Sequence, residues 1–174
     1  MKMKIALVAE ITFRLELEAP PEYLKLLKSN PEIIDAVANG VGSESEGIFY
    51  HLTPDTNWLM NINPVSHAHD WMYTFPLRFN SVAEGLAWKR LADHWFDLNH
   101  KVMIDDGKAF LRGVRNERRT EYNILLDAGG SEAFWCNKML PPDFEYYYST
   151  LPPMNDVQMG KFRLIEEKIK ALNL

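Results

Sequence analysis

The chain has 174 residues, 47% of them hydrophobic and 25% charged, which excludes intrinsic disorder and allows one sizeable core. Its formal net charge of −5 disfavours a nucleic-acid partner, because phosphate binding requires a basic face. The single cysteine, Cys136, excludes an internal disulfide and a multi-cysteine zinc site, and it indicates a reducing compartment. No apolar run approaches the roughly 18 residues of a membrane span. We therefore expect a soluble, cytoplasmic single domain over residues 1–174.

The N-terminal segment, residues 4–17, alternates apolar and polar side chains, with Ile11, Phe13 and Leu15 among the apolar members. A period of two residues predicts a strand or a hairpin, which would form a small N-terminal β element. The first apolar run ends at Glu10, short of the roughly 7–15 residues of a signal-peptide core. We therefore expect no cleaved leader.

Two short helices are predicted over residues 22–28 and 31–38, and a glycine loop with the sequence ANGVG follows at residues 38–42. The two glycines of this loop permit backbone angles that other residues avoid. Residues 43–63 have the pattern of an irregular or partly extended loop.

Two longer helices are predicted next. Asn63 and Pro64 indicate a helix start, because Asn caps a first turn and Pro fits within it, and Pro76 should end this helix. A capping box at residues 81–84 starts a long amphipathic helix that breaks near Gly107. Because the connection between them is short, the two helices should pack antiparallel.

A third helix is predicted over residues 108–127, ending at the glycine pair 129–130. A final helix carries apolar residues from 162 to 172 at helical spacing, after a proline-rich loop over residues 141–155. The sequence thus predicts a mainly α fold, in which an antiparallel core helix pair is joined by the small N-terminal β element.

Four side chains on the predicted helix pair have the spacing of a hydrolytic site. His69 and Tyr73 lie four residues apart and share one helix face, whereas Asp70 is rotated away by roughly 100°. Asp93, on the antiparallel helix, would stand opposite His69 and Tyr73. A carboxylate opposite an imidazole fixes the tautomer of the ring and stabilises the imidazolium that forms when the ring takes a proton from water.

Asp70 would face the glycine loop, where its carboxylate and backbone carbonyls could supply oxygen ligands of the kind that calcium prefers. Three motifs stand in order: the xGxG loop within residues 38–42, HDxxY at residues 69–73 and ADxxF at residues 92–96. This ordered set resembles the phospholipase A2 superfamily, and it is most similar to the disulfide-poor bacterial and viral members. The resemblance covers about residues 38–98.

The resemblance implies a calcium-dependent hydrolase that cleaves the sn-2 ester of phospholipids at a phospholipid or membrane surface. His69 would be the general base, Asp93 its orienting partner and Tyr73 a hydrogen-bond donor to that carboxylate. Asp70 would bind Ca²⁺ through both of its carboxylate oxygens. The carbonyl oxygens of three loop residues would complete the protein ligands: Ala38, Gly40 and Gly42.

Three other interpretations stay open. A non-catalytic structural or interaction protein of phage or prophage origin, associated with the virion, would retain the same scaffold without the chemistry. His67 and His69 would share a face and bind a transition metal if this segment were a strand, although Pro64 favours a helix. The third helix carries four arginines that form either a solvated face or a patch for anionic lipid headgroups: Arg112, Arg115, Arg118 and Arg119.

Overall fold

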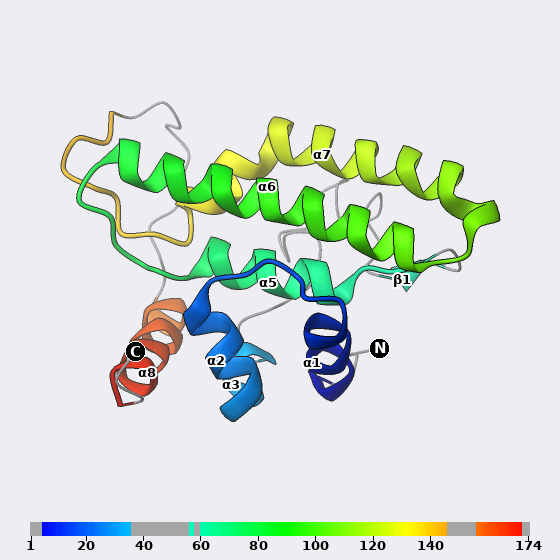
Figure 1. The fold of residues 1–174 in the computed structure, drawn as a ribbon. Coiled ribbons are helices and arrows are strands. Elements are labelled where there is room, and N and C mark those ends of the chain that lie inside the picture. Colours follow the sequence, from blue (N-terminus) through cyan, green and yellow to red (C-terminus); the bar gives the residue numbers. More distant parts are fainter. Residues whose placement is uncertain (1–4, 36–55, 58–59, 146–155, 172–174) are drawn as a thin grey trace.

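The computed structural model describes residues 5–35, 56–57, 60–145 and 156–171, and within these ranges the chain is mainly helical (Figure 1). The N-terminal helices are α1 (Ile5–Arg14), α2 (Pro21–Ser29) and α3 (Pro31–Asp35). The short strands β1 (Thr56–Asn57) and β2 (Met60–Asn61) pair antiparallel. The elements that follow are α5 (Asn63–Thr74), α6 (Val82–Asp106), the 3-10 helix η1 (Ala109–Leu111), α7 (Arg112–Trp135) and α8 (Asp156–Ala171).

Helix α5 lies between two groups of helices, with α6 and α7 on one side and α1 to α3 on the other (Figure 1). The chain reverses direction from α5 to α6 and again from α6 to α7, which confirms the predicted antiparallel helix pair. The connection between α1 and α2 is tied to α6, because Glu18 N–H donates to Asn99 Oδ1 and Asn99 Nδ2 donates to Glu18 O, each at 2.7 Å. None of the described helices carries an apolar stretch long enough to cross a bilayer.

Local signals set the starts of the two central helices. The Ser81 hydroxyl accepts from Glu84 N–H at 3.2 Å, so the predicted N-cap is present. The Glu84 carboxylate accepts from Asn80 N–H, one residue before the cap, at 2.7 Å. Helix α5 begins at Asn63 with Pro64 in its first turn, but the predicted Asn63 cap is wrong, because the N-cap residue is Ile62 and it makes no side-chain cap hydrogen bond. Asn61 Oδ1, just before the cap, accepts from Asn63 N–H at 3.1 Å. The start of each helix determines which of its residues face the partner helix.

The predicted N-terminal strand is wrong, because this segment forms α1. Val8 and Thr12 are the buried residues of this helix, and Ile5 and Ala9 pack on the same core. These four residues follow the i, i+3, i+4, i+7 spacing of a helical stripe, which the sequence contains alongside its alternating pattern. The segment is a helix because this stripe is buried against α5. Phe13, an apolar member of the alternating pattern, is exposed.

Helix α7 passes through the glycine pair and ends at Trp135, so the predicted helix end at residues 129–130 is wrong. A Cβ atom at Gly130 would lie 2.7 Å from Tyr73 Oη and 3.4 Å from Lys89 Nζ. At Gly129 a Cβ atom would meet nothing within 4 Å. A glycine inside a helix costs about 1 kcal/mol relative to alanine. At Gly130 the absence of a side chain allows α7 to lie close to Tyr73 of α5 and Lys89 of α6.

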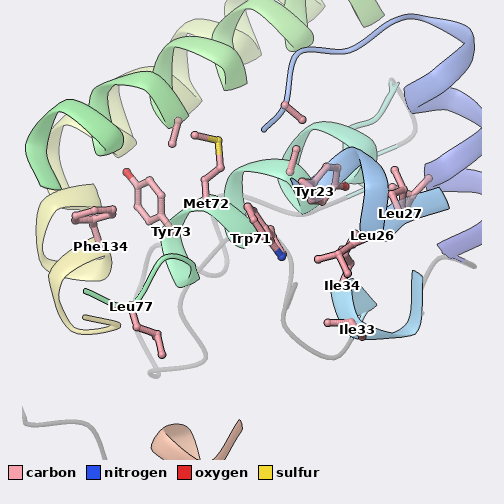
Figure 2. Close-up of a cluster of buried hydrophobic side chains, with 14 of the residues drawn as sticks. Tyr23, Leu26, Leu27, Ile33, Ile34, Trp71, Met72, Tyr73, Leu77 and Phe134 are labelled. Carbon is pink, nitrogen blue, oxygen red and sulfur yellow. The ribbon is translucent and has the colours of Figure 1, made fainter. Parts of the chain in front are cut away.

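Two apolar clusters form the core. The larger joins α2 and α3 to α5 and to the C-terminal part of α7, and Tyr23, Trp71 and Phe134 are its largest fully buried side chains (Figure 2). The smaller cluster lies between the start of α5 and the facing parts of α6 and α7, and it consists of Ile62, Val65, Phe96 and Tyr122. Polar side chains of α5 and α6 meet beside these clusters.

Several sequence predictions fall partly or wholly outside the described residues. The predicted helix over residues 31–38 is described as far as Asp35, where α3 ends. The glycine loop of residues 38–42 lies outside the described ranges, and so does most of the predicted proline-rich loop.

Candidate functional site

His69, Tyr73 and Asp93 form one hydrogen-bonded cluster across α5 and α6. His69 Nε2 lies 3.1 Å from Asp93 Oδ1, and the Tyr73 hydroxyl donates to the same oxygen at 2.7 Å. The rings of His69 and Tyr73, one helical turn apart, have their centroids 4.0 Å from each other. The predicted geometry of these three residues is therefore confirmed, and their catalytic roles stay predictions.

The second oxygen of Asp93 binds a residue that the sequence interpretation missed. Lys89 Nζ donates to Asp93 Oδ2 at 2.6 Å, from one turn earlier on α6. Asp93 Oδ1 thus accepts from the Tyr73 hydroxyl and, where Nε2 carries the ring proton, from His69. Asp93 Oδ2 accepts from Lys89. The i, i+4 spacing of Lys89 and Asp93 was visible in the sequence, but this spacing alone is typical of many solvent-exposed ion pairs.

The surroundings of Asp93 favour its ionised form. Burial raises the pKa of Asp93, but hydrogen bonds from His69, Lys89 and Tyr73 lower it, and the net pKa lies below the ordinary value. Burial and the Asp93 carboxylate together raise the pKa of the Tyr73 phenol, which therefore stays protonated and acts as a donor. The cluster accordingly holds a carboxylate surrounded by three donor groups, and its polar atoms satisfy one another.

The two ring nitrogens of His69 have different environments. The Asp93 carboxylate at Nε2 places the ring proton on that nitrogen in the neutral form, which leaves Nδ1 as a proton acceptor. Asp70 Oδ1 lies 3.8 Å from Nδ1, beyond hydrogen-bonding distance. Burial lowers the pKa of His69, but the Asp70 and Asp93 carboxylates raise it, and the net pKa lies above the ordinary value. A neutral ring in this orientation can take a proton through Nδ1 and deliver it again.

Asp70 is the described part of the predicted calcium site. Its side chain is 13% exposed beside His69, and its hard carboxylate oxygens suit Ca²⁺. The loop carbonyls predicted to complete the site, those of Ala38, Gly40 and Gly42, lie outside the described residues. Among the residues that are described, no group of three or more His, Cys, Asp and Glu side chains is placed to hold a metal ion. The donor chemistry of Asp70 fits calcium, and the loop half of the site stays a prediction.

The transition-metal interpretation of His67 and His69 requires a strand, and the structure has a helix there instead. Two residues along a helix correspond to a rotation of roughly 200°, so the two histidines point to nearly opposite sides of α5. His67 faces the side of Asp35, whose carboxylate opposes the lowering of the His67 pKa by burial. The pair therefore cannot close on one metal ion.

The four arginines of α7 do not form a shared basic face. Arg119 makes a bidentate ion pair with Asp97 of α6, with N···O distances of 2.6 and 3.0 Å. Arg115 is buried, and its guanidinium lies directly against Gly107 at the end of α6. Arg112 and Arg118 are exposed, but each has an acidic partner on its own helix or at the end of α6. The arginines mainly connect α6 and α7 or pair locally.

Lys138 contacts the end of α5 that carries Tyr73, and the sequence interpretation missed this residue as well. Its buried ammonium donates to the Tyr73 carbonyl, in the last turn of α5, and lies 4.7 Å from the centroid of the Phe134 ring. Burial lowers the pKa of Lys138 well below its ordinary value. The position of Lys138 complements the negative end of the α5 dipole and holds Tyr73 in place. No local pattern in the sequence signals a contact between residues so far apart.

His100 is a second buried histidine of α6. It is 0% exposed, and neither ring nitrogen has a hydrogen-bond partner among the described residues. Its ring packs between Phe96 and Tyr122, with both centroid distances at 5.6 Å. Burial and the nearby Arg119 cation lower the pKa of His100 to about 4, although Asp97 opposes the shift. The ring is therefore neutral at neutral pH.

Comparison with known proteins finds no family model, curated protein or solved structure that matches this chain. The resemblance to the phospholipase A2 superfamily therefore depends on the ordered motifs and on the chemistry of the site that the central helices form.

Proposed function

We propose that this protein is a calcium-dependent phospholipase A2-like hydrolase that cleaves the sn-2 ester of phospholipids. One observation carries the proposal: His69 is held through Nε2 by an ionised Asp93 that also binds Tyr73, while Nδ1 points to the side of Asp70. This arrangement gives a buried imidazole one nitrogen anchored by Asp93 and a second nitrogen, beside Asp70, that can exchange protons. General-base catalysis requires the same division of roles.

In the proposed reaction, His69 Nδ1 takes a proton from a water molecule as the water oxygen attacks the sn-2 carbonyl carbon. When the bond from this carbon to the glycerol oxygen breaks, His69 returns the proton to that oxygen. The products are a fatty acid and a lysophospholipid. Asp93 stabilises the imidazolium between the two proton transfers, and Tyr73 keeps the carboxylate in place.

Asp70, together with the predicted carbonyls of the glycine loop, would hold the calcium ion. When bound, calcium supplies positive charge for the ester oxygen and the phospholipid phosphate. The carboxylate of Asp70 keeps the ligand set hard and anionic, in agreement with the oxygen preference of calcium.

The test is fatty-acid release from phospholipid vesicles by the wild type, His69→Gln and Asp70→Asn, with and without a calcium chelator. We expect each substitution and the chelator to reduce the rate by roughly 10²-fold or more, because each removes the base or the charge that the transition state requires. His94→Gln is the matched control, since His94 is exposed on α6. Release that survives both substitutions and chelation would assign the activity to another site.

A second candidate function is a non-catalytic phage or prophage protein that retains this scaffold for assembly or interaction. The burial of His69, which is 6% exposed, favours this candidate, because a closed polar cluster can act purely as a structural connection between α5 and α6. Absence of release by the wild type at millimolar calcium, across neutral and anionic headgroups, would decide for this second function.

A further inference from the structure

Among the described residues, Lys89 is the one lysine or arginine in contact with the Asp93 carboxylate, and its side chain is 9% exposed. It binds Oδ2, which leaves Oδ1 for His69 and Tyr73. Its ammonium also lies 5.8 Å from the centroid of the Tyr73 ring, a favourable position for a cation–π interaction. Lys89 therefore contacts two of the three members of the predicted catalytic cluster.

Lys89 lies where α7 passes close to α5 and α6. A Cβ atom at position 130 of α7 would clash with Tyr73 Oη at 2.7 Å but would only touch Lys89 Nζ at 3.4 Å, so Gly130 leaves space for the tyrosine hydroxyl and packs against the ammonium group. Burying a lysine is costly unless the charge is paired and hydrogen-bonded. An exposed i, i+4 ion pair contributes only a few tenths of a kcal/mol, whereas the side chains of Lys89 and Asp93 are only 9% and 22% exposed.

We propose that Lys89 is a positioning residue that fixes the rotamer of Asp93 and occupies its second oxygen, so that Oδ1 is presented to His69 and Tyr73 together. This inference rests on the proposed hydrolase function. Without Lys89, the carboxylate can turn about its Cβ–Cγ bond and offer either oxygen to water or to His69. The imidazole then loses its fixed orientation, and its Nδ1 atom is less often directed at the attacking water.

A purely structural role makes different predictions. A structural ion pair, when removed, lowers the free energy of unfolding and raises the pKa of Asp93, but it leaves the turnover of the folded enzyme unchanged. Removal of a positioning residue raises the pKa of Asp93 and also lowers the turnover of the folded protein. It also tolerates a substitution that keeps the positive charge better than one that removes it.

The experiment compares Lys89→Met, Lys89→Gln and Lys89→Arg with the wild type, and Lys101→Met is the matched control because Lys101 is exposed on the same helix. Two readouts are used on folded protein: kcat and KM for phospholipid vesicles at saturating calcium, and the titration of the Asp93 carboxyl followed by carbon-13 NMR. For Lys89→Met we expect kcat to fall about tenfold or more with KM nearly unchanged. The pKa of Asp93 should rise, and Lys89→Arg should keep more activity than Lys89→Met.

Three outcomes separate the possibilities. If Lys89→Met hydrolyses phospholipid at the wild-type kcat, or if its Asp93 titrates as in the wild type, the positioning role is refuted and the hydrolase function stands. If the wild type shows no hydrolysis, the proposed function fails, and the carboxyl titration alone decides whether Lys89 controls Asp93. If Lys89→Met does not fold, Lys89→Gln, which keeps a donor without the charge, gives the same two readouts.

Discussion

Gly130→Ala is the substitution whose effect can be worked out most directly from the structure. The added methyl group would lie 2.7 Å from Tyr73 Oη, closer than a carbon atom can approach an oxygen, so the hydroxyl must move. Tyr73 has little room to move, because its ring packs against the rings of His69 and Phe134, with centroids at 4.0 and 5.4 Å. The displacement should break the hydrogen bond from Tyr73 to Asp93.

The adjacent Gly129 is a matched control within the same helix. An alanine in place of either glycine gains about 1 kcal/mol of helix propensity, and this gain cancels when the two variants are compared. What remains is the loss of a hydrogen bond to a charged group, about 1.5–3 kcal/mol. Gly130→Ala should therefore be about 1.5–3 kcal/mol less stable than Gly129→Ala, which should be at least as stable as the wild type.

Urea denaturation followed by circular dichroism gives the two free energies of unfolding. Tyr73→Phe supplies the second arm of a double-mutant cycle, because the phenylalanine ring has no hydroxyl for the methyl group to displace. In that background Gly130→Ala should cost less than it does in the wild type. Equal stabilities of Gly130→Ala and Gly129→Ala would refute the reasoning, since they would show that Gly130 makes no close approach to Tyr73.

Two further predictions concern buried polar groups of α6. Asp93→Ala should lower the free energy of unfolding by about 3 kcal/mol, because it leaves Lys89, His69 and Tyr73 without their shared acceptor, and Asp93→Asn should cost less. A melting temperature equal to that of the wild type would show that the cluster contributes nothing to stability. The pKa of His100 is about 4 in the folded state against 6.5 ordinarily, so the unfolded chain binds more protons between these values. Stability should therefore fall as the pH drops from 6.5 towards 4, by roughly 3 kcal/mol from this residue, and His100→Leu should remove that dependence.

The pH prediction is measured by urea denaturation at a series of pH values. His94→Leu is its control, because His94 lies exposed on the same helix and should leave the slope unchanged. A slope for His100→Leu that equals the wild-type slope would assign the acid sensitivity to carboxylates such as Asp97, which also has a lowered pKa.

The sequence predicted the geometry of the site wherever local spacing determines it. His69 and Tyr73 share a face because they lie four residues apart, and the N-cap at Ser81 set the start of the helix that carries Asp93. Because the two helices are antiparallel and joined by a short connection, Asp93 is expected to lie opposite His69, where the structure has it. The helix pair and its polar cluster therefore followed from the sequence.

Features that depend on a third element could not be predicted in this way. The role of Gly130 follows from the position of Tyr73 on another helix, and the same residue type ends many helices, so the glycine pair was misinterpreted as a stop. Lys138 reaches the Tyr73 carbonyl across 65 positions of sequence. The N-terminal segment fits both a period of two and a helical stripe, and only the packing of Val8 against the α5 core decides between them.

The most direct test of the central claim is the fate of solvent oxygen during hydrolysis. Phospholipid vesicles are incubated with the wild type and calcium in water enriched in oxygen-18, and the products are analysed by mass spectrometry. If His69 activates a water molecule that attacks the sn-2 carbonyl carbon, one oxygen-18 atom should enter the released fatty acid and none should enter the lysophospholipid, and His69→Gln should release both products at least roughly 10²-fold more slowly. Release of no fatty acid, or of label in the lysophospholipid, would contradict the proposed hydrolysis.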